Sequence, residues 1–152
     1  MHLEDMMTVL RALPLFARFP EEPLRLVAFS AERVRRREGQ RLFSQNAPAF
    51  TALILVDGVI AFQNEAGEET ARLHPPALIG EQALVTDATR PATAVMVEAG
   101  QLIEIPRLLI RRVLEEYPET VALVREHFAR RLDAQLREFE RVAARLDALD
   151  EA

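Results

Sequence analysis

The chain has 152 residues, of which 49% are hydrophobic and 28% charged, which is enough for one ordinary hydrophobic core. Its 24 acidic and 19 basic side chains give a formal net charge of −5, which excludes a protein that holds nucleic acid or anionic lipid by overall charge. The absence of cysteine excludes disulfides, thiolate zinc sites, iron–sulfur clusters and cysteine nucleophiles. Apolar runs far shorter than ~20 residues and an acidic N-terminus predict one cytoplasmic domain over residues 1–152.

Apolar residues at helical spacing predict two short helices within about residues 5–31, interrupted by Pro14 and Pro20. From about residue 33 to 105 the sequence changes to β-branched and apolar runs separated by glycine or proline. We expect strands at 40–43, 51–56, 58–63, 70–73 and 93–97. This spacing predicts a small antiparallel roll or sandwich.

Four dipeptides that end in glycine mark the expected turns of this β unit: Glu38-Gly39, Asp57-Gly58, Ala66-Gly67 and Ala99-Gly100. At Gly58 and Gly100 we expect a left-handed backbone, which glycine adopts without steric penalty.

Helices are expected again over about residues 107–149, with Pro106 at a first helical position and Pro118 before a long final helix. Apolar residues follow alternating steps of three and four along this helix: Val121, Phe128, Leu132, Phe139, Val142, Leu146 and Leu149. The first half of this stripe either packs on the β unit or pairs with another helix. Beyond Phe139 little β surface is left to cover, which favours a partner helix in a homodimer.

Residues 79–93 combine groups that suit a sugar phosphate. Gly80 permits a close approach, residues 81–85 can form one helical turn, and Arg90 is expected to be the only fixed cation that faces the phosphate. Glu81 would repel a bare phosphate but could accept a hydrogen bond from a sugar hydroxyl. The alternative is a surface loop in which Glu81 caps its own turn and Arg90 is solvated.

The motif Gly80-Glu81-x-Ala83-Leu84 with Arg90-x-Ala92-Thr93 resembles the phosphate-binding cassette of the cyclic nucleotide-binding domain family. Further segments resemble the family in the same order: Leu13-Pro14-Leu15-Phe16, Glu38-Gly39-Gln40, residues 56–60 and Ala129-Arg130-Arg131-Leu132. The resemblance covers about residues 10–136. It implies an α+β fold in which an antiparallel, jelly-roll-like β-roll is flanked by N-terminal helices and a long C-terminal helix.

The resemblance also implies roles for individual residues. Glu81 would accept from the ribose 2′-hydroxyl, Arg90 would pair with the cyclic phosphate, and backbone N–H groups of residues 80–83 would complete the phosphate shell. Gln135 stands three positions beyond Arg-Arg-Leu, where bacterial catabolite activators have a residue that contacts the base. The candidate ligand-binding residues are Gly80, Glu81, Gln82, Ala83, Arg90, Pro91, Ala92, Phe62, Leu73 and Gln135.

Some of these positions have a plainer interpretation or depart from the family. Phe62 and Leu73 are equally compatible with plain core positions, and Gln135 with a polar residue that fixes helix register. Pro91 has no N–H to offer a phosphate, and Pro76 and Gln82 also differ from the usual family residues.

Two other groups of residues carry weaker signals. Arg33, Arg35, Arg36 and Arg37 form a basic cluster, interpreted as a solvated strand edge in preference to a nucleic-acid patch. His2, His74 and His127 have no metal-ligand spacing, although a haem sensor that uses His74 is an alternative.

The sequence thus predicts a non-enzymatic regulatory sensor that binds a cyclic nucleotide, cAMP or else cGMP, without a cofactor or metal. We expect a homodimer formed by the C-terminal helix, which passes the signal to an effector protein. No direct contact with nucleic acid or membrane is expected. The alternatives are a dimerisation scaffold with a vestigial pocket and the sensor half of a longer transcription regulator.

Overall fold

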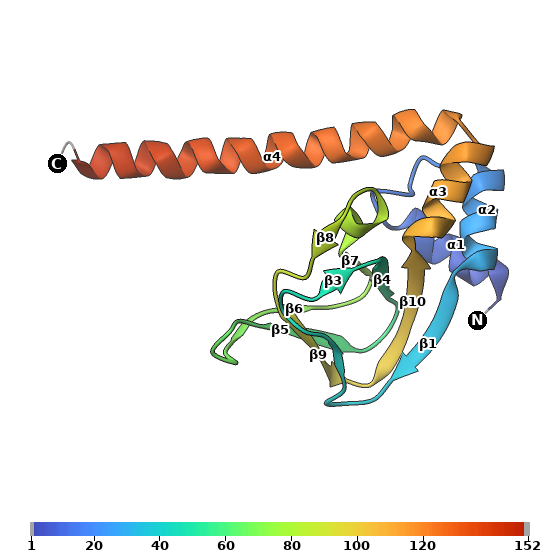
Figure 1. Cartoon of the computed structure of the whole chain (residues 1–152), viewed down its shortest axis with the longest axis horizontal. Coiled ribbons are helices and arrows are strands. Elements are labelled where there is room, and N and C mark those ends of the chain that lie inside the picture. The colour runs from blue at the N-terminus through green and yellow to red at the C-terminus, as the bar shows by residue number, and fades with distance from the viewer. Residues whose placement is uncertain (1, 151–152) are drawn as a thin grey trace.

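The computed structural model describes residues 2–150, in which helices from both ends of the chain flank a β-roll (Figure 1). The helices are α1 (Leu3–Arg11), α2 (Glu21–Ser30), α3 (Arg107–Glu116) and α4 (Glu119–Asp150). The strands are β1 (Glu32–Arg36), β2 (Arg41–Phe43), β3 (Pro48–Ala49), β4 (Thr51–Leu55), β5 (Val59–Gln63), β6 (Glu69–Leu73), β7 (Ala77–Ile79), β8 (Ala88–Thr89), β9 (Thr93–Glu98) and β10 (Gly100–Pro106). A short 3-10 helix, η1 (Glu81–Leu84), lies between β7 and β8.

The strands form two antiparallel four-stranded sheets and one short ribbon. The sheet orders are β1-β10-β4-β7 and β2-β9-β5-β6, and β3 pairs with β8. Leu55 and Leu102 of the first sheet pack against Ile60 and Met96 of the second in one buried cluster. The expected α+β architecture, an antiparallel β-roll with flanking helices, is therefore confirmed.

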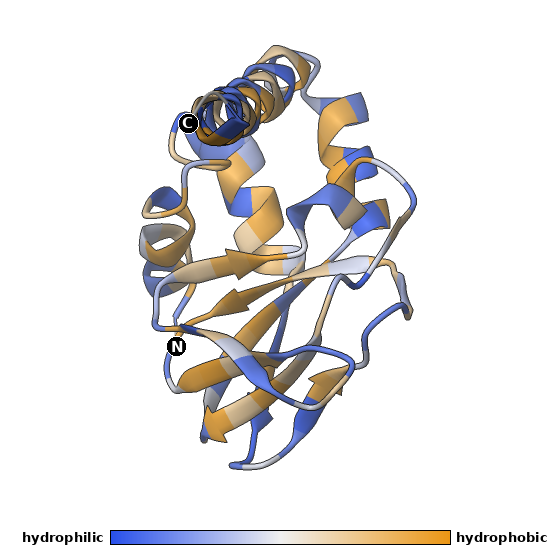
Figure 2. Cartoon of the chain, turned by 90° about the vertical axis from the view of Figure 1, so that its left-hand side faces the viewer, coloured by the Kyte–Doolittle hydropathy of each residue, from blue (hydrophilic) through white to orange (hydrophobic). Residues whose placement is uncertain are grey.

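A second core lies between the first sheet and the helices. Strand β10 serves both cores, because its Leu102 joins the cluster between the sheets while Ile103 and Ile105 pack with the helices. Phe16 and Ile110 are among the residues that meet them from the helical side. In Figure 2 the strands of the roll are largely hydrophobic, whereas α4, seen almost end-on, alternates between hydrophobic and hydrophilic residues. The first sheet therefore packs against the helices on one face and against the second sheet on the other.

Five strands differ from the sequence prediction, since β1, β3, β7, β8 and β10 were not among those expected. Four of the five residues of β1 are charged, and β3, β7 and β8 are only two or three residues long. Short or charged strands of this kind lack the apolar alternation by which a strand is found in a sequence.

Gly58 and Gly100 are both required, but for different reasons. Gly58 has the expected left-handed conformation, with a φ of 91°. Gly100 does not have a positive φ, so that expectation was wrong. A side chain at Gly100 would instead collide with the backbone of Asp57, whose carboxylate Oδ1 accepts a hydrogen bond from the N–H of Gln101 at 2.6 Å. Gly100 thus allows two chain segments to approach closely.

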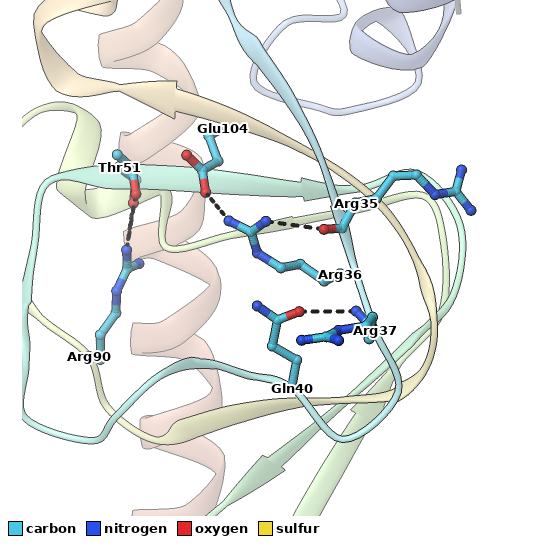
Figure 3. Close-up of polar contacts among 7 residues, drawn as sticks. All are labelled: Arg35, Arg36, Arg37, Gln40, Thr51, Arg90 and Glu104. Atoms are coloured by element: carbon cyan, nitrogen blue, oxygen red, sulfur yellow. Dashed lines mark hydrogen bonds and ion pairs between the residues drawn. The ribbon is translucent and has the colours of Figure 1, made fainter.

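The basic cluster lies on and just after β1, which is the outer strand of its sheet. Arg33 and Arg35 are exposed, while Arg36 forms an ion pair with Glu104 of the neighbouring strand at 3.5 Å (Figure 3). The backbone N–H of Arg37 donates to the side chain of Gln40 at 3.0 Å. These positions agree with the interpretation of a solvated strand edge.

Between residues 2 and 150, the structure has no helix that is long and apolar enough to cross a membrane.

Candidate ligand site

A cavity of about 540 Å³ opens between the roll, the segment 79–93 and α4. This volume lies within the range of small-molecule sites, about 300–1,000 Å³. Nine of the ten candidate residues line it: Phe62, Leu73, Gly80, Glu81, Gln82, Ala83, Arg90, Pro91 and Gln135. Ala92 is half-buried and is not part of the wall. Residues far apart in the sequence thus meet around one cavity, while a ligand contact for Ala92 stays a prediction.

Arg90 is the most unusual group in the wall, because it is a cation that is only 6% exposed. Its Nη2 donates to the carbonyl of Thr51 at 2.9 Å and to the Thr51 hydroxyl at 3.3 Å (Figure 3), and its guanidinium lies 4.4 Å from the centre of the Phe43 ring. Its Nη1 is buried and has no hydrogen-bond partner within residues 2–150. Burial lowers the pKa of the Arg90 guanidinium from its ordinary value. An anion in the cavity would relieve both the missing hydrogen bond and the burial of the charge.

Gly80 makes room for this guanidinium. Its φ of 74° is left-handed, and a Cβ at this position would collide with Nη1 of Arg90. Glycine at position 80 is therefore required both by the backbone conformation and by the neighbouring cation.

Replacing Gly80 by alanine is expected to destabilise the protein more than the same change at Gly67. Both residues have a left-handed φ, 74° and 78°, but apart from its chain neighbours no atom of residues 2–150 lies within 4 Å of a Cβ built on Gly67. Gly67→Ala should therefore cost only the backbone penalty of about 1–2 kcal/mol. Gly80→Ala should cost more because Arg90 must also move. Urea denaturation of the two variants measures the difference, and equal losses would contradict a close approach of Arg90 to Gly80.

Arg107, the first residue of α3, holds the segment 79–93 from outside the cavity. Its Nε donates to the carbonyl of Ala83 at 2.6 Å, its Nη2 to the carbonyl of Ala49 at 3.0 Å, and its Nη1 pairs with Asp87 at 2.8 Å. One side chain thus ties η1 and β3 to α3. Arg107 could not be singled out from the sequence, because its partners lie 20 to 58 positions away.

Glu81 is a buried carboxylate, 6% exposed, whose partners come from α4. Its Oε2 lies 2.9 Å from Nε2 of His127, and its Oε1 forms an ion pair with Arg131. The contact of Oε1 with Arg131 lacks hydrogen-bond geometry. No side-chain hydrogen bond caps η1 at Gly80. The alternative of a surface loop with a self-capping Glu81 and a solvated Arg90 is therefore wrong.

Helix α4 supplies one side of the cavity through Phe128, Arg131, Leu132 and Gln135. Arg131 is a second cation in the wall, but its side chain is 55% exposed and pairs with Glu81, so Arg90 as the only fixed cation that faces a phosphate stays a prediction. The Arg-Arg-Leu run in the sequence could have suggested Arg131. Phe43 from β2 was also missed, since an aromatic residue in a short strand carries no sign of a site.

The three histidines belong to different parts of the fold: His2 precedes α1, His74 follows β6 and His127 lies in α4. His74 is exposed and is not part of the cavity wall. Nowhere in residues 2–150 do three or more His, Cys, Asp or Glu side chains gather as a metal ion would require. His127, in contrast, is buried against Glu81.

Several solved structures resemble this fold. A cyclic nucleotide-binding-like protein from Brucella abortus is 37% identical, with a TM-score of 0.68 over 73% of this chain and 98% of its own. The N-terminal domain of a transcriptional regulator from Streptomyces coelicolor is 26% identical, with a TM-score of 0.78 over 86% and 94%. The catabolite activator protein of Thermus thermophilus is 25% identical, with a TM-score of 0.71 over 86% of this chain and 63% of its own. No curated protein sequence matched the chain.

A family model also matches the chain directly. It is described as the cyclic nucleotide-binding domain and covers residues 33–117, which include the whole roll from Arg33 and the segment 79–93. The match spans more than half of the chain and agrees with the fold and with the cavity. The chain therefore belongs to the cyclic nucleotide-binding domain family.

Proposed function

We propose that this chain is a regulatory sensor that binds a cyclic nucleotide in the cavity, with cAMP as the first candidate and cGMP as the second. The observation that carries the proposal is the buried Nη1 of Arg90, which has no hydrogen-bond partner in the described part of the chain and shares a cavity of about 540 Å³ with Glu81. A phosphate supplies the acceptor that Arg90 lacks, and a ribose hydroxyl supplies a donor for Glu81. A cyclic nucleotide combines the two in one small molecule.

The rest of the cavity suits the base. Phe62 and Leu73 form part of its apolar wall on the roll, and Gln135 of α4 can both donate to and accept from a purine edge. The segment 79–93 thus holds the sugar phosphate, while the apolar wall of the roll and the helix contact the base. Because these groups bind rather than react, the chain acts as a binding module and not as an enzyme.

Signalling is proposed to run through α4, because this helix contributes to the cavity wall and then extends beyond the roll (Figure 1). Its distal side chains Phe139, Val142, Leu146 and Leu149 are 49–70% exposed. They continue a heptad spacing, which a second copy of the same helix can cover. We therefore propose a homodimer through α4, whose output passes to an effector protein.

A dimerisation scaffold with a vestigial pocket is the second candidate. It is favoured by Pro91, which lines the cavity without an N–H, and by Glu81, which already has partners in α4. Titration calorimetry of the purified chain with cAMP, cGMP and 5′-AMP separates the candidates. A sensor binds one cyclic nucleotide in preference to the open monophosphate. A scaffold releases no heat with any of the three.

Replacing Glu81 by glutamine is expected to weaken cAMP more than 2′-deoxy-cAMP. The carboxylate accepts a charge-assisted hydrogen bond from the ribose hydroxyl, which is worth about 1.5–3 kcal/mol, and the analogue has no such donor. Calorimetry with both ligands measures the ratio of the two losses. Equal losses would assign Glu81 to the anchoring of α4 alone.

A further inference from the structure

His127 contacts the site from a position that no sequence motif marks. It lies near the start of α4 and is 7% exposed. Its Nε2 is 2.9 Å from Oε2 of Glu81, which is 46 positions away in the sequence. Its ring also packs edge-on against Phe128, with the centroids 5.3 Å apart. The imidazole is therefore fixed by its surroundings and is not a mobile surface group.

His127 and Arg131 contact different oxygens of the same carboxylate. Arg131 lines the cavity and its side chain is 55% exposed, whereas His127 is not part of the wall. A sugar hydroxyl that arrives through the cavity therefore meets Arg131 first and leaves the imidazole in place. An ionised carboxylate has about four acceptor positions, so the contact with His127 does not prevent Glu81 from accepting from a ligand.

We propose that His127 is a positioning residue for the ligand site: its imidazole holds the buried carboxylate of Glu81 in the orientation that accepts a sugar hydroxyl. The proposal rests on the proposed function and adds a residue to it. The same hydrogen bond connects the cavity to the buried start of α4, so the Glu81 carboxylate and the helix hold each other in place. A side chain locked by a second group loses less conformational freedom when it binds its ligand.

Three variants of the full chain test this role. His127→Phe keeps a ring of similar size and removes the nitrogen, whereas His127→Gln retains an N–H donor at similar reach. His74→Phe makes the same change at an exposed histidine outside the cavity wall. Circular dichroism and urea unfolding first establish that each variant is folded.

Calorimetry with cAMP and 2′-deoxy-cAMP then measures the effect on binding. We expect His127→Phe to weaken cAMP about tenfold, which is the scale of one charge-assisted hydrogen bond, and the 2′-deoxy analogue by less than about twofold. His127→Gln should recover most of the affinity for cAMP, and His74→Phe should match the wild type. Equal losses for the two nucleotides, or no recovery with His127→Gln, would overturn the role of His127 because a purely structural residue gives that pattern.

Amide hydrogen exchange, measured without nucleotide, tests the contact between His127 and Glu81 independently of the proposed function. His127→Phe and Glu81→Gln should each speed amide exchange over residues 119–131 of α4, and the double variant should exchange no faster than either. His127→Gln should exchange like the wild type. Unchanged exchange in His127→Phe would overturn the link to α4. A wild-type chain that binds no cyclic nucleotide would instead overturn the proposed function.

Discussion

Replacing Arg90 by alanine is expected to weaken the binding of cAMP at least ~30-fold, because removal of one partner of a desolvated charge pair costs about 2–5 kcal/mol. The guanidinium is buried, and its Nη1 is left without an acceptor among the described residues. This is the group that a cyclic phosphate would satisfy. Titration calorimetry measures the loss.

The same substitution should leave the free protein folded. The two hydrogen bonds to Thr51 favour the folded state, but the buried charge opposes it, as the lowered pKa of Arg90 indicates. We therefore expect the free energy of unfolding of Arg90→Ala to stay within about 2 kcal/mol of the wild-type value. Arg130→Ala, at an exposed position on α4, is the matched control and should bind as the wild type. An affinity unchanged by Arg90→Ala would remove the phosphate assignment.

The double variant Phe139→Glu, Leu146→Glu is expected to be monomeric at about tens of micromolar, where the wild type is a dimer. Both side chains are exposed in the single chain, 70% and 58%, and a parallel pair of helices would bury them against their symmetry mates. The variant would place four like charges in one apolar seam, which is strongly unfavourable without compensating partners. Multi-angle light scattering measures the mass.

The control for this variant adds the same charge away from the stripe. Ala148 lies nine residues after Phe139, which at 100° per residue is the opposite side of the helix, and Ala134 also faces away from the stripe. Ala134→Glu, Ala148→Glu should therefore remain dimeric. A wild-type chain that is monomeric with and without nucleotide would contradict the homodimer and leave the stripe on α4 without a second copy.

The helices and strands that could be predicted are those whose apolar pattern continues along most of their length. Strands β4 and β5 and helix α4 were expected nearly at their observed bounds. Strand β1 was not expected, because Arg33, Arg35 and Arg36 hide its single half-buried apolar residue, Val34. The reason for Gly100 was also hidden, since it depends on how closely the backbone of Asp57 passes.

The site was predictable where its residues are close together in the sequence. Gly80, Glu81 and Arg90 belong to one segment whose spacing carries a family motif, and they do meet at the cavity. His127 and Arg107 contact the same segment from helices that follow much later. A lone histidine and a lone arginine carry no such spacing, so only the folded chain shows what they contact.

The seating of α4 at only one end makes the helix a lever. From Ala129 to Asp150 every side chain except that of Ala143 is exposed, and these 22 residues extend about 33 Å at 1.5 Å per residue. A tilt of about 5° at His127 would therefore shift the tip by about 3 Å, which is more than half the 5.4 Å pitch of the helix. A rearrangement at Glu81 that tilted α4 would therefore displace the far end of the helix more than the cavity itself.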